Sequence, residues 1–213
     1  MKLLNAFDID FAFLAFSSLF SIINPISAAP IFVTLTEGHG IDRKKSAWRT
    51  SLSAGLALAL FAVAGGAIFA FFGITVAAFQ IAGGILFTLM SIQALLSDKP
   101  ETVEDGPDQA DPSIVPLGIP LIAGPGAIST VMVLVGQARD TFHRVALAGA
   151  ITINIILTLL VLLTSPWIVR KMGATGQRIV AKVMGLITAV VGVQFIINGS
   201  TAVVMEILKS AKA

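Results

Sequence analysis

The chain consists of long apolar runs separated by short polar connections. Six runs carry no charged residue in their central stretches, at 11–36, 47–72, 76–96, 114–136, 145–169 and 179–208. The hydrocarbon core of a bilayer requires about 20 consecutive apolar residues for one helical crossing. Each run is long enough, so the pattern predicts an all-α integral membrane protein with six transmembrane helices.

Composition supports this reading and narrows the function. Of 213 residues, 56% are hydrophobic and only 12% are charged, whereas a soluble domain has about a quarter of its residues charged. We therefore expect the whole chain, 1–213, to form a single membrane domain. The sequence has no cysteine, no tyrosine and two histidines, which leaves few candidates for a catalytic or metal-binding group. We expect neither an enzyme nor a metal or cofactor site.

The connections between the runs differ in charge. Those after the first, third and fifth runs hold nine of the Lys and Arg residues, and the other side holds five. Basic residues concentrate on the cytoplasmic side, so both termini are expected on the opposite, non-cytoplasmic side of the membrane. The connection at 97–113 is rich in Asp, Glu and Pro and is predicted to be a mobile cytoplasmic loop. The net charge of +2 fits membrane orientation, and no nucleic acid is expected as a partner.

The two halves of the chain resemble each other at an offset of about 100 residues. The matches are Asn24-Pro25 with Gly124-Pro125, Gly73-Ile74-Thr75 with Gly173-Ala174-Thr175, and Gly84 and Gln93 with Gly185 and Gln194. Repeat one is then 9–96 and repeat two is 114–208. Because each repeat has three spans, the second must enter the bilayer from the opposite face, which predicts the 3+3 inverted repeat of many secondary transporters.

Prolines fall in equivalent helices of the two repeats. Pro25 and Pro30 lie inside the first run, and Pro116, Pro120 and Pro125 lie inside the fourth. A proline inside a helix removes a backbone hydrogen bond, and in lipid the freed polar groups need protein, water or ligand partners. The sequence therefore predicts that helices one and four are broken near the middle of the membrane. Ordinary proline kinks are the alternative.

The two breaks are the candidate binding site. A half-helix that starts after a proline presents N–H groups, and the half-helix before it ends in carbonyls, so the pair suits a zwitterion. No ionisable residue lies in the middle of a span, so we expect a small solute that is net neutral. The candidate residues are Asn24, Pro25, Ser27, Ala28, Gly124, Pro125, Gly126, Ala127, Ser129 and Thr130.

A few other polar residues lie within or near the spans. Gln93 and Gln194 are secondary candidates because they recur in the repeat, although amides in spans more often hold helices together, as we expect of Asn154 and Asn198. The loop residues His39 and His143 are expected at a solvated surface.

The motifs at the two breaks identify a family. The segments 24–30 and 120–128, with Met184-Gly185 and the run 192–199, resemble the MarC family of inner-membrane proteins over nearly the full length. That family includes SnatA-type carriers of small neutral amino acids such as glycine and alanine. The resemblance implies a secondary transporter of such solutes, with the Asn24-Pro25 and Gly124-Pro125-Gly126 turns as binding elements. The alternatives are a passive channel for a small neutral solute and a MarC-family protein of unassigned cargo. The oligomeric state is left open.

Overall fold

All regular structure in the described part of the chain is helical. The computed structural model describes residues 6–36, 41–96 and 113–211, and these residues contain no β-strand. The elements are α1 (Ala6–Ile23), α2 (Pro25–Leu35), α3 (Arg43–Phe72), α4 (Val76–Leu96), η1 (Ser113–Ile122), α5 (Pro125–Gln137) and α6 (Thr141–Ser210). The all-α prediction is confirmed for these residues, whereas the predicted acidic loop lies outside them apart from Ser113.

Four segments are long and apolar enough to cross a membrane, namely Ile9–Val33, Arg43–Phe72, Thr141–Trp167 and Gly185–Ser210. The helices η1 and α5 meet at a bend of 54° and supply a fifth crossing if they are counted as one span. Helix α4 contributes a shorter apolar stretch, Val76–Leu89. The described residues thus hold four or five candidate spans, and the arrangement of six spans as an inverted repeat stays a prediction.

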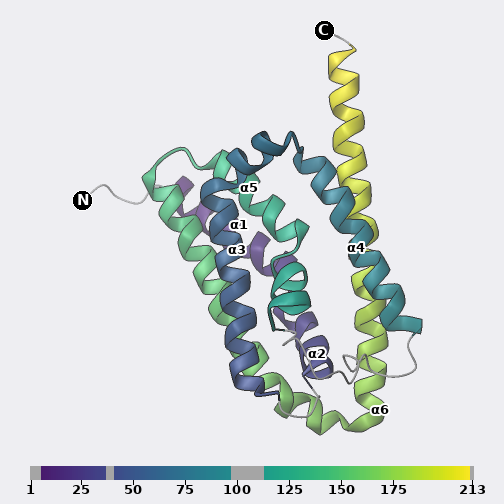
Figure 1. Cartoon of the computed structure of the whole chain (residues 1–213). Helices are drawn as coiled ribbons and strands as arrows, with labels where there is room; N and C mark the ends of the chain where they lie inside the picture. The colour runs from purple at the N-terminus through teal and green to yellow at the C-terminus, as the bar shows by residue number, and fades with distance from the viewer. Residues whose placement is uncertain (1–5, 37–40, 97–112, 212–213) are drawn as a thin grey trace.

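Helix α6 contains two of these segments, which run in opposite directions. In Figure 1 it descends on one side of the molecule, turns at the lower end and rises along α4 to the C-terminus. We call Thr141–Trp167 the first limb of α6 and Gly185–Ser210 the second limb. The start of α1 and the end of α6 both lie toward the upper end of Figure 1.

The ends of α3 follow from its sequence. The Asp42 carboxylate accepts hydrogen bonds from the backbone N–H groups of Lys44 and Lys45, at 3.0 and 3.3 Å, and so caps the first turn. At the other end Gly73 adopts φ +62°, and the N–H of Ile74 donates to the carbonyl of Phe69 at 2.8 Å. Glycine adopts this left-handed conformation without a steric penalty, which places the start of α4 directly after α3.

Small residues bring α4 and the second limb of α6 into backbone contact. A Cβ atom added to Gly192 would lie 2.8 Å from the Gly84 carbonyl oxygen, and one added to Gly199 would lie 2.6 Å from the Ala77 carbonyl oxygen. Helices in membranes associate through such small side chains because lipid provides no hydrophobic drive between them. The seven-residue spacing of the contacts on both helices keeps them on one face of each.

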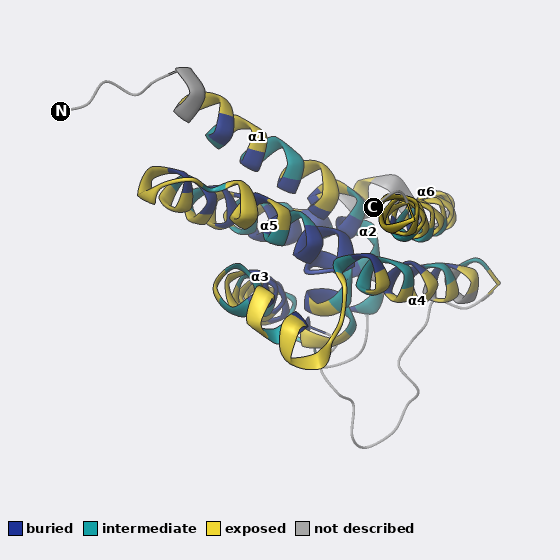
Figure 2. Ribbon diagram, turned by 90° about the horizontal axis from the view of Figure 1, so that it is seen from above, coloured by how far each residue is buried: buried dark blue, intermediate teal, exposed yellow. Residues whose placement is uncertain are grey.

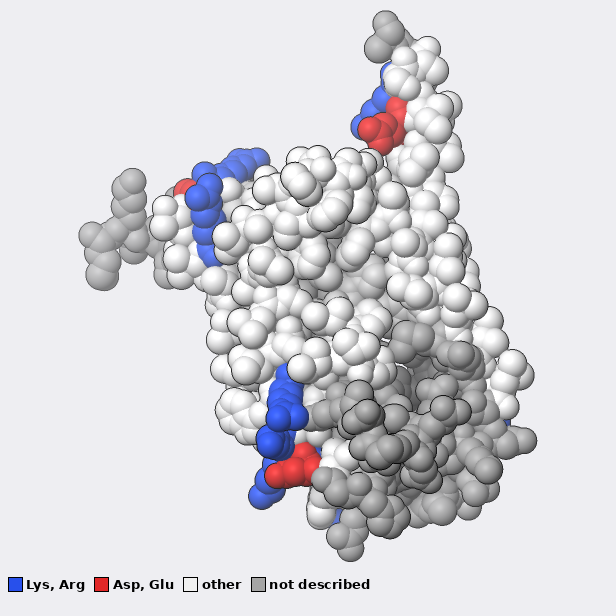
Figure 3. Space-filling model, in the orientation of Figure 1, with Lys and Arg blue, Asp and Glu red and all other residues white. Residues whose placement is uncertain are grey.

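The outer surface is apolar between two charged ends. Figure 2 shows buried residues where α2 and α5 pass through the centre and exposed residues on the outward faces of the other helices. Large side chains such as Val63 and Phe71 are 90% and 84% exposed. In Figure 3 the Lys and Arg side chains lie at the two ends, with an uncharged belt between them. A belt of this kind faces the hydrocarbon of a bilayer.

Candidate solute-binding site

The first break separates α1 from α2 at Asn24. This residue has φ +42°, a left-handed conformation that asparagine tolerates better than most residues. Its N–H still donates to the Phe20 carbonyl at 2.9 Å. Its side-chain Oδ1 accepts from the Ser27 N–H at 3.3 Å, so Asn24 ends one helix and caps the next. Pro25 takes the first helical position, where its missing N–H is not needed.

The second break separates η1 from α5. Val115 and Ile119 each precede a proline and have extended conformations, at φ −127° and −134°, as expected because proline disfavours the helical conformation of the residue before it. Gly124 is the N-cap of α5 and, having no side chain, provides no side-chain cap. The α5 N-terminus is therefore left with the uncapped N–H groups that a helix start presents.

A cavity of about 330 Å³ lies between the two breaks and the second limb of α6. Its volume falls within the range of small-molecule sites. Predicted residues from both breaks line it, together with one secondary candidate: Asn24, Ser27, Ala28, Gly124, Gly126, Ala127 and Gln194. We call it the central cavity. The fold thus brings segments about 100 residues apart in sequence to one space, and binding of a solute there stays a prediction.

The central cavity is uncharged. Its polar side chains come from both walls: Ser21, Asn24 and Ser27 from α1, α2 and their junction, and Thr188, Gln194 and Asn198 from α6. The Gln194 Nε2 donates to the Asn198 Oδ1 at 2.8 Å, which fixes the two amides relative to each other. Among the residues that the structure describes, no Asp, Glu, Lys, Arg or His lines the space. Amides and hydroxyls in an apolar surrounding suit a small, polar and net-neutral solute.

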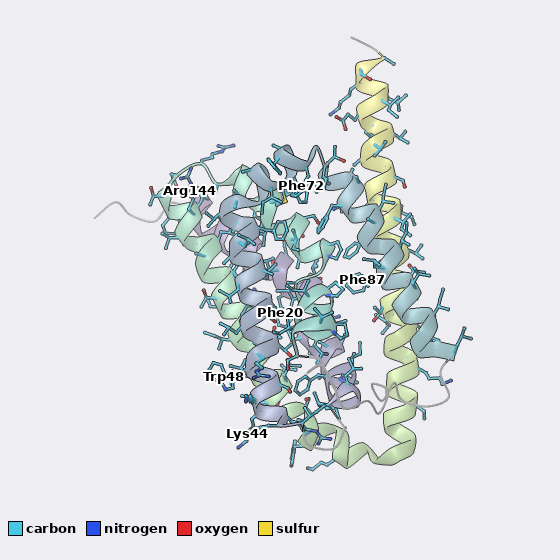
Figure 4. The ribbon with its side chains drawn as sticks, viewed as in Figure 1. Phe20, Lys44, Trp48, Phe72, Phe87 and Arg144 are labelled. Carbon is cyan, nitrogen blue, oxygen red and sulfur yellow. The ribbon has the colours of Figure 1, made fainter. Side chains whose placement is uncertain are left out.

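Two phenylalanines that the sequence reasoning missed form the apolar wall. The rings of Phe87, from α4, and Phe195, from α6, lie 6.0 Å apart in a T-shaped arrangement. Phe87 points from α4 toward the central helices in Figure 4. A Cβ atom added to Gly124 would lie 2.9 Å from the Phe87 ring, and one added to Gly126 would collide with the Phe195 ring. The glycines are therefore required for these rings to reach the break.

Four predicted site residues do not line the central cavity. Pro25 is fully buried, and Pro125 packs against Gly83 of α4. Ser129 and Thr130 line a separate, smaller cavity. The side chain of the secondary candidate Gln93 lies outside the described residues.

The expectation that His143 is solvated is wrong. Its side chain is only 7% exposed and meets the edge of Phe11 with ring centres 4.5 Å apart. The Asp140 carboxylate, which caps α6, lies 2.7 Å from its Nδ1. His39 lies outside the described residues. Asn154 holds helices together, because its Nδ2 donates to the Phe16 carbonyl of α1 at 3.3 Å.

Apolar helices, an uncharged belt and a central cavity between broken helices define an integral membrane protein. Residues 9–204 match the family model described as MarC family integral membrane protein, and the chain belongs to this family. No three His, Asp or Glu side chains gather as a metal site among the described residues.

Relatives occur in bacteria and archaea. A UPF0056 membrane protein of Methanocaldococcus jannaschii is 37% identical over 90% of this chain and 97% of its own length. The UPF0056 membrane protein YvbG of Bacillus subtilis is 39% identical over 85% of this chain and 90% of its own length. YhcE of Escherichia coli is 28% identical over 91% and 93% of the two chains. No solved structure matches this chain.

Proposed function

We propose that the protein is a secondary transporter of small neutral amino acids of the glycine and alanine type, with the central cavity as its binding site. The observation that carries the proposal is the meeting of two helix breaks at one uncharged cavity lined by amides and hydroxyls. Broken helices at a shared site are the usual binding architecture of secondary transporters. The resemblance to SnatA-type carriers supports the same cargo class, although the relatives' names state no cargo.

The N-terminus of α5 is the better place for a carboxylate. At the start of α2 the Asn24 side chain already accepts from the Ser27 N–H, whereas the start of α5 has no side-chain cap and its Gly126 and Ala127 line the cavity. The helix dipole adds to the attraction for an anionic group there. The ammonium group would then bind the carbonyls with which α1 ends, near Ile23.

The same observations favour a carrier over the alternative of a passive channel. The central cavity and a second, smaller cavity are lined by different residues of α5, Gly126 and Ala127 in the first and Ser129 and Thr130 in the second, which fits two separate spaces better than one continuous pore. In a carrier, the two repeats would rock about the site and open it to one side at a time. We place the protein in the bacterial inner membrane with both termini in the periplasm, because nine basic residues against five favour that orientation.

Uptake of radiolabelled alanine and glycine into liposomes containing the purified protein tests the proposal. Gly126→Leu should slow the uptake of alanine, because the added side chain collides with Phe195 and overpacking costs about 1 to 3 kcal/mol, or roughly five- to a hundredfold. Glycine, the smaller solute, should be affected less. Gly66→Leu is the matched control, since a Cβ atom there meets nothing within 4 Å. Equal uptake of alanine by both variants would show that the binding site is not in the central cavity.

A further inference from the structure

A second cavity, of about 210 Å³, lies near the central one. Five of its eight lining residues are polar, whereas six of nineteen are polar in the central cavity. They are Ser18 of α1, Gln80 of α4, and Ser129, Thr130 and Gln137 of α5. None of the described residues that line it is charged. Gln137 is exposed at the end of α5, whereas Ser18, Gln80, Ser129 and Thr130 are buried or half-buried. Polar side chains within an apolar helix bundle are costly and mark solute pathways.

Residues of the same three helices, α1, α4 and α5, line both cavities. On α5, Gly126 and Ala127 line the central cavity, and Ser129 begins the set that lines the second one. On α1 the second cavity is lined at Ser18, and the central cavity by residues that follow it, from Ser21 onward. On α4, Gln80 lines the second cavity, and Phe87, two turns later, lines the central cavity. The second cavity therefore lies between the central cavity and the end of the molecule where α1 begins (Figure 1).

Hydrogen bonds connect the two walls. The Gln80 Nε2 donates to the Ser129 Oγ at 3.1 Å, and this hydroxyl donates to the Gly126 carbonyl at 3.0 Å. Gly126 lines the central cavity, so these bonds link a residue of that cavity to two side chains of the second one. The amide of Gln80 has a second N–H and a carbonyl oxygen, which together with the Thr130 hydroxyl can bind a polar solute.

We propose that this second cavity is another binding station for the same class of solute, a small neutral amino acid, on its way between the central cavity and the aqueous face nearest the start of α1. The inference rests on the proposed function. The second cavity is smaller than the central one but has the same kind of lining, hydroxyls and amides with no charge among the described residues. The turn of α5 that carries Gly126 and Ser129 lies between the two cavities.

Cysteine accessibility in liposomes tests the second station. The native chain lacks cysteine, so Thr130→Cys can be labelled with a small hydrophilic thiol reagent, with and without alanine or glycine. We expect labelling that either amino acid slows roughly tenfold at saturating concentration. Met132→Cys is the matched control on the same helix, because Met132 packs against Gly65 of α3, and it should stay unlabelled.

The outcomes separate the two proposals. If the cysteine-free parent transports alanine and glycine but neither slows the labelling of Thr130→Cys, the second binding station is ruled out. The proposal of a central site is then unaffected. Absence of labelling at Thr130→Cys, with full labelling of the denatured protein, overturns the station as well. Failure of the proposed function is seen in a different measurement, as absence of alanine and glycine uptake by the cysteine-free parent. If, in addition, neither amino acid slows the labelling of Thr130→Cys, both proposals are overturned.

Discussion

Asn24 shapes the backbone at the first break and also faces the central cavity. Replacing it by alanine removes its hydrogen bond to the Ser27 N–H and any bond to the solute. The bond to the Ser27 N–H is exposed, so its loss by itself costs little, whereas a solute group left without a partner in a closed site costs about 1 to 3 kcal/mol; we therefore expect Asn24→Ala to lower the affinity or the turnover for alanine roughly five- to a hundredfold. The measurement is initial uptake at several alanine concentrations.

Asn24→Gly separates the side chain from the backbone. Glycine keeps the positive φ of 42° without strain, whereas alanine does not. We expect Asn24→Gly to be produced and inserted normally but to transport alanine as poorly as Asn24→Ala. Transport equal to that of the parent would show that only the backbone shape matters at this position.

Asp140 makes the stability of the α6 start dependent on pH. Hydrogen bonds from the backbone N–H and the side chain of His143 hold the pKa of this carboxyl below its ordinary value of 3.8. A carboxyl whose pKa is lower in the folded state stabilises the fold above its unfolded-state pKa and loses that contribution as the pH falls through its folded-state value.

We therefore expect the Tm of the detergent-solubilised protein to fall below about pH 4 in part through Asp140. Asp140→Asn keeps a capping oxygen but does not titrate, so it should lower the Tm at neutral pH and flatten the fall toward acid. An acid-side decrease as steep in Asp140→Asn as in the parent would contradict this account.

Sequence reasoning predicted the parts of the candidate site that depend on local rules. The positions of Pro25 and Pro125 predict where the backbone breaks, and small neighbours predict open space there. Phe87, Phe195 and Gln80 were missed because their roles arise from contacts between helices far apart in sequence. A lone amide in an apolar run was a usable signal for Gln80, but a phenylalanine in such a run is indistinguishable from a lipid-facing one.

At the scale of elements, the contact between α4 and the second limb of α6 is the most sensitive to side-chain size. Gly192→Leu would place a branched side chain against the Gly84 carbonyl and the Thr88 hydroxyl. The helices would have to separate, and we expect a loss of about 1 to 3 kcal/mol in stability together with lower transport, because Phe195 lies one turn away on the same limb.

Gly149→Leu is the matched control for this prediction. It lies on the first limb of the same helix, where a Cβ atom meets nothing within 4 Å. Thermal unfolding in detergent should show a lower Tm for Gly192→Leu and little change for Gly149→Leu. Equal Tm values would mean that the close backbone approach contributes nothing to stability.

Helix content and the breaks were predictable because hydrophobic runs and prolines act locally. The turn between the predicted fifth and sixth runs was also predictable, because the sequence around 170–178 is polar and contains glycine, and the two limbs of α6, Thr141–Trp167 and Gly185–Ser210, flank it. The sequence did not predict that the backbone of this turn stays helical, because a count of apolar residues does not reveal backbone hydrogen bonds.

For the whole molecule, the charge distribution predicts the orientation. Lys45 lies in the first turn of α3, next to Lys44, which Figure 4 shows at the end of the molecule opposite the start of α1 and the end of α6. Arg139 lies between α5 and α6. We expect an impermeant thiol reagent to label Arg139→Cys on intact cells, and Lys45→Cys only after the membrane is opened. The reverse pattern would place the termini in the cytoplasm.

The central claim is that the cavity between the two breaks carries small neutral amino acids by alternating access. Counterflow in liposomes tests it most directly: vesicles loaded with unlabelled alanine are diluted into a trace of labelled alanine. The account predicts transient accumulation of label above its equilibrium level, saturating with external alanine, and a counterflow roughly five- to a hundredfold slower in Asn24→Gly. Uptake that is linear in concentration and indifferent to the preloaded alanine, or no uptake of alanine and glycine at all, would contradict it.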